Sequence, residues 1–77
     1  MNKARRNRIT DVQSQLEALK QEIDSILAEE QEAYDNMPES LQECERGQAM
    51  QEAIDALESA VSSCEELDEY LTNATEQ

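Results

Sequence analysis

The chain has 77 residues, of which 19 are acidic and six basic, giving a net charge of −13, and it contains one Gly, one Pro and no His, Phe or Trp. A chain of this length supports one domain with a thin core, and two turn-forming residues exclude a β architecture, which needs a turn about every 8 to 12 residues. The missing His excludes the usual catalytic triads, and a single Gly excludes a phosphate loop, so we expect no enzyme, no cofactor and no metal site.

The first eight residues form a basic arm that differs in charge from everything after it. Its four cations are Lys3, Arg5, Arg6 and Arg8, whereas residues 9–77 hold two cations against 19 acids, a net charge of −17. Cations oppose the helix dipole at an N-terminus, so we expect either a late start of the ordered helix or an acidic group that holds the arm. Three roles stay open: a solubilising end, a contact with the acidic body of a dimer partner, and a contact with nucleic acid.

An apolar repeat predicts a first long helix over about residues 5–35. Its spacing alternates between three and four residues, as do positions a and d of a heptad. Position a holds Ile9, Leu16, Ile23, the charged Glu30 and Met37, and position d holds Val12, Leu19, Ile26 and Ala33. Leu27 and Tyr34 add a column at position e. The apolar face is therefore wider than a two-stranded coiled coil requires.

Pro38 predicts an irregular link over residues 36–44. Proline lacks a backbone N–H and disfavours helical geometry at the preceding Met37, so the first helix should end before it. Because proline suits the first turn of a helix, a short helical turn is expected after it. Gly47 lies a little further on and either weakens the first turn of the second helix or marks a bend into it.

The same repeat predicts a second long helix over about residues 45–73. Position a holds Met50, Leu57, Cys64 and Leu71, position d holds Ala53, Ala60, Leu67 and Ala74, and position e adds Ile54 and Val61. Cys64 is expected to be a small core residue. Cys44 lies near the link, and both thiols are expected to stay reduced.

Two helices of similar length with a short link predict an antiparallel, coiled-coil-like hairpin. We expect one partner helix to leave the residues at e, namely Leu27, Tyr34, Ile54 and Val61, partly exposed in a monomer. A homodimer that forms a four-helix bundle would cover them, and it is the predicted state of the protein. A continuous long helix paired with a second copy is the structural alternative.

The acidic residues predict a surface that repels nucleic acid and membranes and attracts basic proteins. The candidate partner surface consists of Glu17, Glu22, Asp24, Glu29, Glu52, Asp55, Glu58, Glu65 and Glu69. Regular carboxylates on a rigid rod can imitate the phosphate rows that nucleic-acid-binding proteins recognise. The same pattern is also typical of a solvated helix face. The dense run around Glu66 and Asp68 lacks the spacing of a calcium loop.

The segment EEQEAYDNMPESLQ at residues 29–42, followed by ERG at 45–47, resembles small acidic helical proteins of bacteriophages and mobile elements. The resemblance implies a phage accessory protein in the bacterial cytoplasm, in a class that includes inhibitors of host proteins. It assigns no site residues. No apolar run approaches the roughly 20 residues needed to span a bilayer, which also favours a soluble protein. We predict a non-catalytic interaction module, with a dimerisation or scaffolding module, or a nucleic-acid contact through the basic arm, as alternatives.

Overall fold

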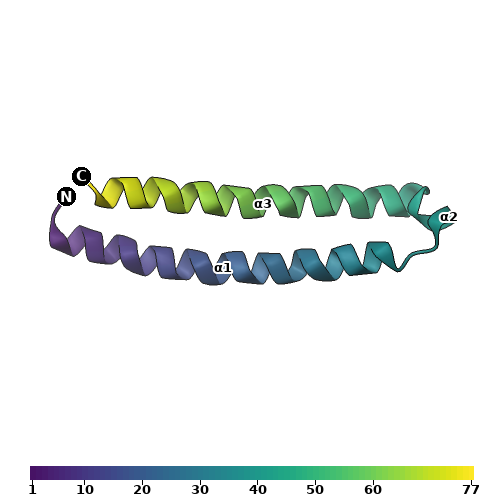
Figure 1. Ribbon diagram of the computed structural model, residues 1–77, viewed down its shortest axis with the longest axis horizontal. Coiled ribbons are helices and arrows are strands. Elements are labelled where there is room, and N and C mark those ends of the chain that lie inside the picture. Colours follow the sequence, from purple (N-terminus) through teal and green to yellow (C-terminus); the bar gives the residue numbers. More distant parts are fainter.

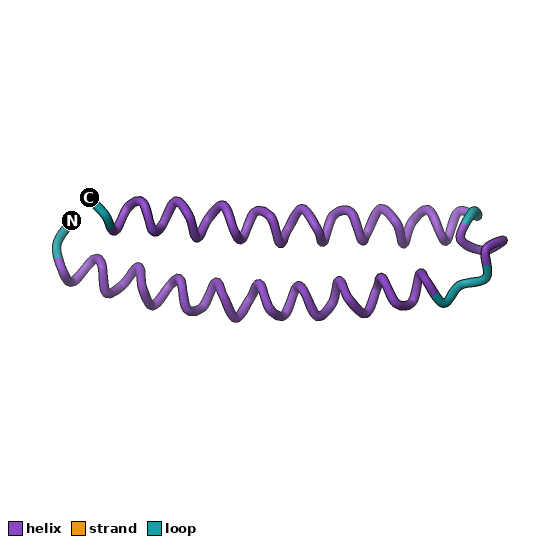
Figure 2. The backbone as a smooth tube through the Cα atoms, viewed as in Figure 1, coloured by secondary structure: helices purple, strands orange, loops and turns teal.

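The computed structural model describes residues 1–77 and contains three helices and no strand, so the all-α prediction is confirmed (Figures 1 and 2). The helices are α1, Lys3–Asp35, α2, Glu39–Gln42, and α3, Glu45–Thr75. α1 and α3 lie side by side and run in opposite directions, with both termini at one end of the rod and α2 at the other (Figure 1). The rod measures 58 × 16 × 12 Å. We call its two ends the terminal end and the turn end.

The first turn of α1 includes the basic arm. Asn2 caps the helix, because its Oδ1 accepts a hydrogen bond from the backbone N–H of Arg5 at 2.8 Å. The cap satisfies a donor that a helix start otherwise leaves open. Of the two alternatives for the arm, a late start of the ordered helix is therefore wrong, because α1 begins at Lys3. The N-terminal ammonium donates to the carbonyl oxygen of Gln77 at 2.8 Å, which joins the two ends of the chain.

Two residues shape the turn end: Gln42, through a side-chain hydrogen bond, and Gly47, which has no side chain. The Nε2 of Gln42 donates to the carbonyl oxygen of Tyr34 at 2.8 Å, which satisfies an acceptor at the end of α1. Gly47 is buried inside the first turn of α3, and a Cβ added there would overlap the backbone carbonyl of Gln42. Gly47 therefore allows α2 to lie directly against α3.

The seam between α1 and α3 uses positions a and e, whereas a and d are the pair typical of a coiled coil. Ile54 at e is 1% exposed and Leu16 at a is 9% exposed, and they are the only large side chains that are buried. The expectation that the residues at e would be partly exposed in a single chain is wrong for Ile54. The residues it names on α1, Leu27 and Tyr34, are half-buried, as is Val61 on α3.

The sequence of α3 explains this choice of seam. Its e column contains the branched residues Ile54 and Val61, whereas its d column has Ala at positions 53 and 60. Turning e toward α1 removes more apolar surface from water than turning d would. The d column of α1 is consequently left outside the seam, although Val12 and Leu19 are apolar.

The predicted core residues fall into three groups by exposure. Two are buried, Leu16 and Ile54, and nine are half-buried: Ile9, Ile23, Leu27, Tyr34, Met50, Leu57, Val61, Cys64 and Leu71. The remaining four are exposed, and all of them occupy position d: Val12, Leu19, Ile26 and Leu67. No helix combines the length and the apolar character that crossing a bilayer requires.

Candidate interaction surfaces

The helix pair has two broad sides, one on each side of the seam. In antiparallel helices the same heptad position flanks the seam on the same side in both partners. Positions d and g of α1 and α3 therefore share one side, and positions b share the other. The apolar side is defined by Val12, Leu19, Ile26, Ala53, Leu67 and Tyr70. The polar side is defined by Glu17, Asp24, Glu58 and Glu65, with Lys20 and Asp68 at its border with the seam.

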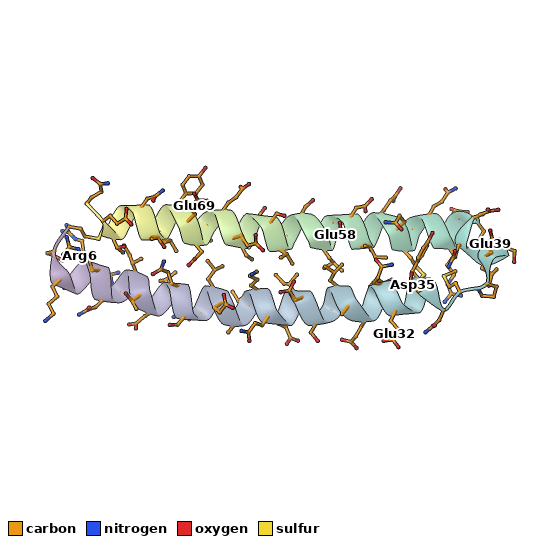
Figure 3. The ribbon with its side chains drawn as sticks, in the orientation of Figure 1. Arg6, Glu32, Asp35, Glu39, Glu58 and Glu69 are labelled. Atoms are coloured by element: carbon orange, nitrogen blue, oxygen red, sulfur yellow. The ribbon has the colours of Figure 1, made fainter.

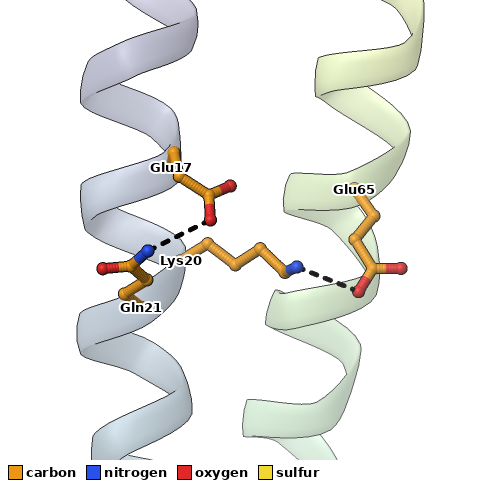
Figure 4. A network of polar contacts seen from close by, with 4 residues as sticks. All are labelled: Glu17, Lys20, Gln21 and Glu65. Carbon is orange, nitrogen blue, oxygen red and sulfur yellow. Dashed lines mark hydrogen bonds and ion pairs between the residues drawn. The ribbon is translucent and has the colours of Figure 1, made fainter.

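Polar contacts bridge the two helices along the polar side. The Nζ of Lys20 lies 3.4 Å from the Oε1 of Glu65, and Figure 4 shows Lys20 reaching across from α1 to α3. The hydrogen bond to Glu65, together with the charge of that carboxylate, raises the pKa of Lys20. Nearer the termini, the Nε2 of Gln13 donates to the Oδ1 of Asp68 at 3.2 Å and to the Oγ1 of Thr72 at 3.0 Å. Gln13 and Lys20 interact with α3 in the seam itself, which sequence reasoning missed.

A small hollow lies on the polar side between the helices. It has a volume of about 110 Å³ and is lined by Leu16, Glu17, Lys20, Cys64, Glu65 and Asp68. Small-molecule sites usually measure about 300 to 1,000 Å³, so this hollow is too small for a typical cofactor. No group of three or more His, Cys, Asp or Glu side chains is placed to hold a metal ion.

The carboxylates are almost all without a cationic partner. Of the 19 acidic residues, only Glu65 forms an ion pair. All nine residues of the candidate partner surface are exposed, and acidic side chains such as Glu32 point away from the opposite helix (Figure 3). Glu17, Asp24, Glu58 and Glu65 share the polar side. Glu22 and Glu29 lie at position g of α1, on the apolar side, and Glu52, Asp55 and Glu69 lie on the outer edge of α3. The heptad positions thus bring together four of the nine.

The apolar side exposes large apolar side chains on both helices. Val12 is 46% exposed, Leu19 60%, Ile26 45%, Leu67 46% and Tyr70 69%. The contacts of Lys20 with Glu65 and of Gln13 with Asp68 set the register of the two helices. They place Leu19 level with residues 62–66 of α3, so Leu67 lies somewhat nearer the terminal end than Leu19. The contrast between Ala at position d and Ile or Val at position e of α3 could have predicted from the sequence that position d stays exposed.

The basic arm is divided between the two sides. Arg5 and Arg8 lie at the terminal end of the apolar side, where they line a hollow of about 270 Å³ together with Met1, Ile9 and Val12. Lys3 and Arg6 occupy positions b and e and belong to the polar side. None of the four cations forms an ion pair within the chain. Arg5 and Arg8 are thus available to a group that approaches the apolar side.

The two cysteines are free and half-buried. Cys44 is the residue that precedes the first turn of α3, and the backbone N–H of Gly47 lowers the pKa of its thiol. Cys64 lies at position a of the seam.

No family model matches the chain, and neither a curated protein nor a solved structure matches it. The function is therefore inferred from the charge and exposure of the two broad sides.

Proposed function

We propose that α1 and α3 form a stable helical hairpin that acts as a non-catalytic protein-protein interaction module and binds a basic protein through its carboxylates. The observation that carries the proposal is the single ion pair among 19 acidic residues. Carboxylates without internal partners, held on two long helices, create a strong negative field. Such a field attracts basic protein surfaces over long range and repels nucleic acid.

The polar side favours a basic groove as the surface that is bound. Glu17 and Asp24 lie on α1, and Glu58 and Glu65 lie on α3, so the side carries two short rows of carboxylates, of which only Glu65 is paired with a cation, Lys20. Within each row the carboxylates are seven residues apart, which corresponds to roughly 10 Å along a helix. Two rows of regularly spaced charge imitate the two phosphate backbones of a nucleic acid. We propose that the module occupies the groove of a nucleic-acid-binding protein and blocks it.

The resemblance of residues 29–47 to small acidic phage proteins supports a role as an inhibitor in a bacterial cytoplasm. The target would then be a host protein that binds DNA or RNA. An inhibitor of this kind needs no catalytic group, since it acts by occupying the groove.

The test compares two variants of equal charge. One replaces the four carboxylates of the polar side by Glu17→Gln, Asp24→Asn, Glu58→Gln and Glu65→Gln. The control makes four equivalent changes near the turn end, Glu32→Gln, Asp35→Asn, Glu39→Gln and Glu43→Gln. Immobilised protein should retain bacterial nucleic-acid-binding proteins that double-stranded DNA elutes, and only the polar-side variant should lose them.

Three results would contradict the proposal. They are capture of no nucleic-acid-binding protein by the unaltered chain, equal losses in the two variants, and binding that persists above roughly 0.5 M salt, where electrostatic contacts between exposed charges are screened.

A second candidate function is a dimerisation or scaffolding module, and the exposed row of the apolar side favours it. In that case the polar-side variant should keep full function, and a charge placed at Leu19 should abolish it.

A further inference from the structure

We propose that the apolar side is covered by a second copy of the same chain that lies on it with its long axis reversed. The result is a four-helix bundle in which α1 packs against α1 of the second copy and α3 against α3. The inference rests on the proposed hairpin, and it is independent of the basic partner proposed for the polar side.

The amount of exposed surface supports a covered side. The chain exposes 5720 Å², whereas a compact monomer of 8.8 kDa exposes about 4,800 Å². The apolar side lies along the two longest dimensions of the rod, 58 and 16 Å. These dimensions accommodate the roughly 800 Å² per partner that a standard protein interface buries.

The apolar row of α1 fits a reversed copy of itself. Its d column reads Arg5, Val12, Leu19, Ile26 and Ala33, so Leu19 stands at the centre. With a two-fold axis at Leu19, Val12 lies opposite Ile26 of the second copy, and Leu19 meets its own equivalent. The most exposed aliphatic side chain of the protein thereby reaches the middle of the interface.

Small residues of α3 face its large ones about the same axis. Because the axis crosses α3 between residues 62 and 66, Leu67 falls opposite Ala60 of the second copy. At position g, Tyr70 falls opposite Ala56 of the second copy, and the small alanine leaves room for the ring. Tyr70 is the most exposed large hydrophobic side chain, and aromatic residues are enriched in protein interfaces.

The charges at position g of α1 favour the reversed orientation. This column reads Arg8, Gln15, Glu22 and Glu29. In the reversed copy Arg8 lies opposite Glu29, and Gln15 lies opposite Glu22. The symmetry produces each pair twice. Arg8 has no partner within its own chain, and the second copy supplies one.

The alternative orientation, with both turn ends together, lacks this complementarity. It places α1 against α3 of the second copy, whose g column of Ala49, Ala56, Ser63 and Tyr70 has no acidic residue for Arg8. It also brings together two copies of residues 29–52, each with eight acids and one cation. Like charges brought together oppose association.

Disulfide cross-linking tests the proposal in the full chain. Cys44→Ser and Cys64→Ala first remove the native thiols, and circular dichroism checks that the protein stays helical. Leu19→Cys and Leu67→Cys are then made separately in this background and oxidised, alone and mixed. Ser14→Cys is the matched control, because Ser14 lies at position f on the outer edge of α1.

The proposal predicts that Leu19→Cys forms a disulfide-linked dimer with itself and that Ser14→Cys does not. Leu67→Cys should cross-link with itself less than Leu19→Cys does, because Leu67 and its equivalent are displaced from each other along the rod. Cross-linking only in the mixture of Leu19→Cys and Leu67→Cys would show the opposite orientation and overturn the proposal. Cross-linking no faster than that of Ser14→Cys would overturn the second copy as the occupant of this side. Neither outcome affects capture by the polar side, so the two proposals fail separately.

Discussion

The two broad sides of the helix pair are built from the same helices and differ in how their side chains are satisfied. On the polar side, Lys20 reaches Glu65 and Gln13 reaches Asp68 and Thr72, so the chain supplies its own partners. On the apolar side, Leu19 and Leu67 face water without a partner. The difference is that contacts within the chain bridge the two helices along the polar side, whereas the apolar side leaves large side chains uncovered.

A substitution in the seam between the two sides should give the largest effect, on the free energy of unfolding. Ile54→Ala removes the most buried side chain of the protein, and it should lower the free energy of unfolding by about 2 to 5 kcal/mol. Urea denaturation at a fixed protein concentration measures the loss. Leu57→Ala, a half-buried neighbour, should cost less, and equal losses at the two positions would contradict the placement of Ile54 in the centre of the seam.

A charge on the apolar side should give the second-largest effect, on dimerisation. Leu19→Glu places a carboxylate at the centre of the proposed dimer, and it should raise the dissociation constant at least about 100-fold, roughly 2.8 kcal/mol. Sedimentation equilibrium measures the constant. Ser14→Glu on the outer edge is the control and should leave it unchanged. An unchanged constant for Leu19→Glu would mean that the apolar side is not the interface.

The charge pairs at position g should contribute less than the apolar row. Arg8→Glu places like charges opposite each other, and it should weaken the dimer roughly tenfold, since exposed pairs are each worth about 0.2 to 1 kcal/mol. The exchange Arg8→Glu with Glu29→Arg restores opposite charges and should recover the affinity. Failure of the double variant to recover it would argue against the reversed orientation.

Replacing Lys20 on the polar side should give the smallest effect, on the melting temperature. Because Glu65 raises the pKa of Lys20 above 10.5, the pair stabilises the folded chain fully below that pH, and the stabilisation is lost as the pH rises through the raised pKa. Thermal melts should therefore show that Lys20→Gln lowers the melting temperature slightly at pH 8 and not at high alkaline pH. The dimer mass should not change. A pH-independent difference would contradict the ion pair.

The sequence predicted the helices well and the seam poorly, for a physical reason. The apolar spacing and Pro38 placed both long helices, because period and chain breaks are local properties. The stripe at a, d and e allowed two seams, and the choice depends on which pair of columns buries more area once both helices are present. The contrast between Ile54 and Ala53 could have decided it. The presence of Gln13 and Lys20 at position e of α1 pointed the other way.

The candidate partner surface was predictable as exposed residues and not as one surface. All nine carboxylates are exposed, as charged residues on long helices usually are. Their distribution over two sides and an outer edge follows from the seam, so it became visible only with the register of α1 and α3. Of the nine candidate carboxylates, four therefore lie together on the polar side: Glu17, Asp24, Glu58 and Glu65.

The mass of the unaltered chain in solution tests most directly whether the apolar side is covered by a second copy. Light scattering over a range of micromolar concentrations should give twice the chain mass of 8.8 kDa, and the same measurement on Leu19→Glu should give the single chain. A mass of 8.8 kDa at every concentration, from protein that circular dichroism shows to be fully helical, would contradict it.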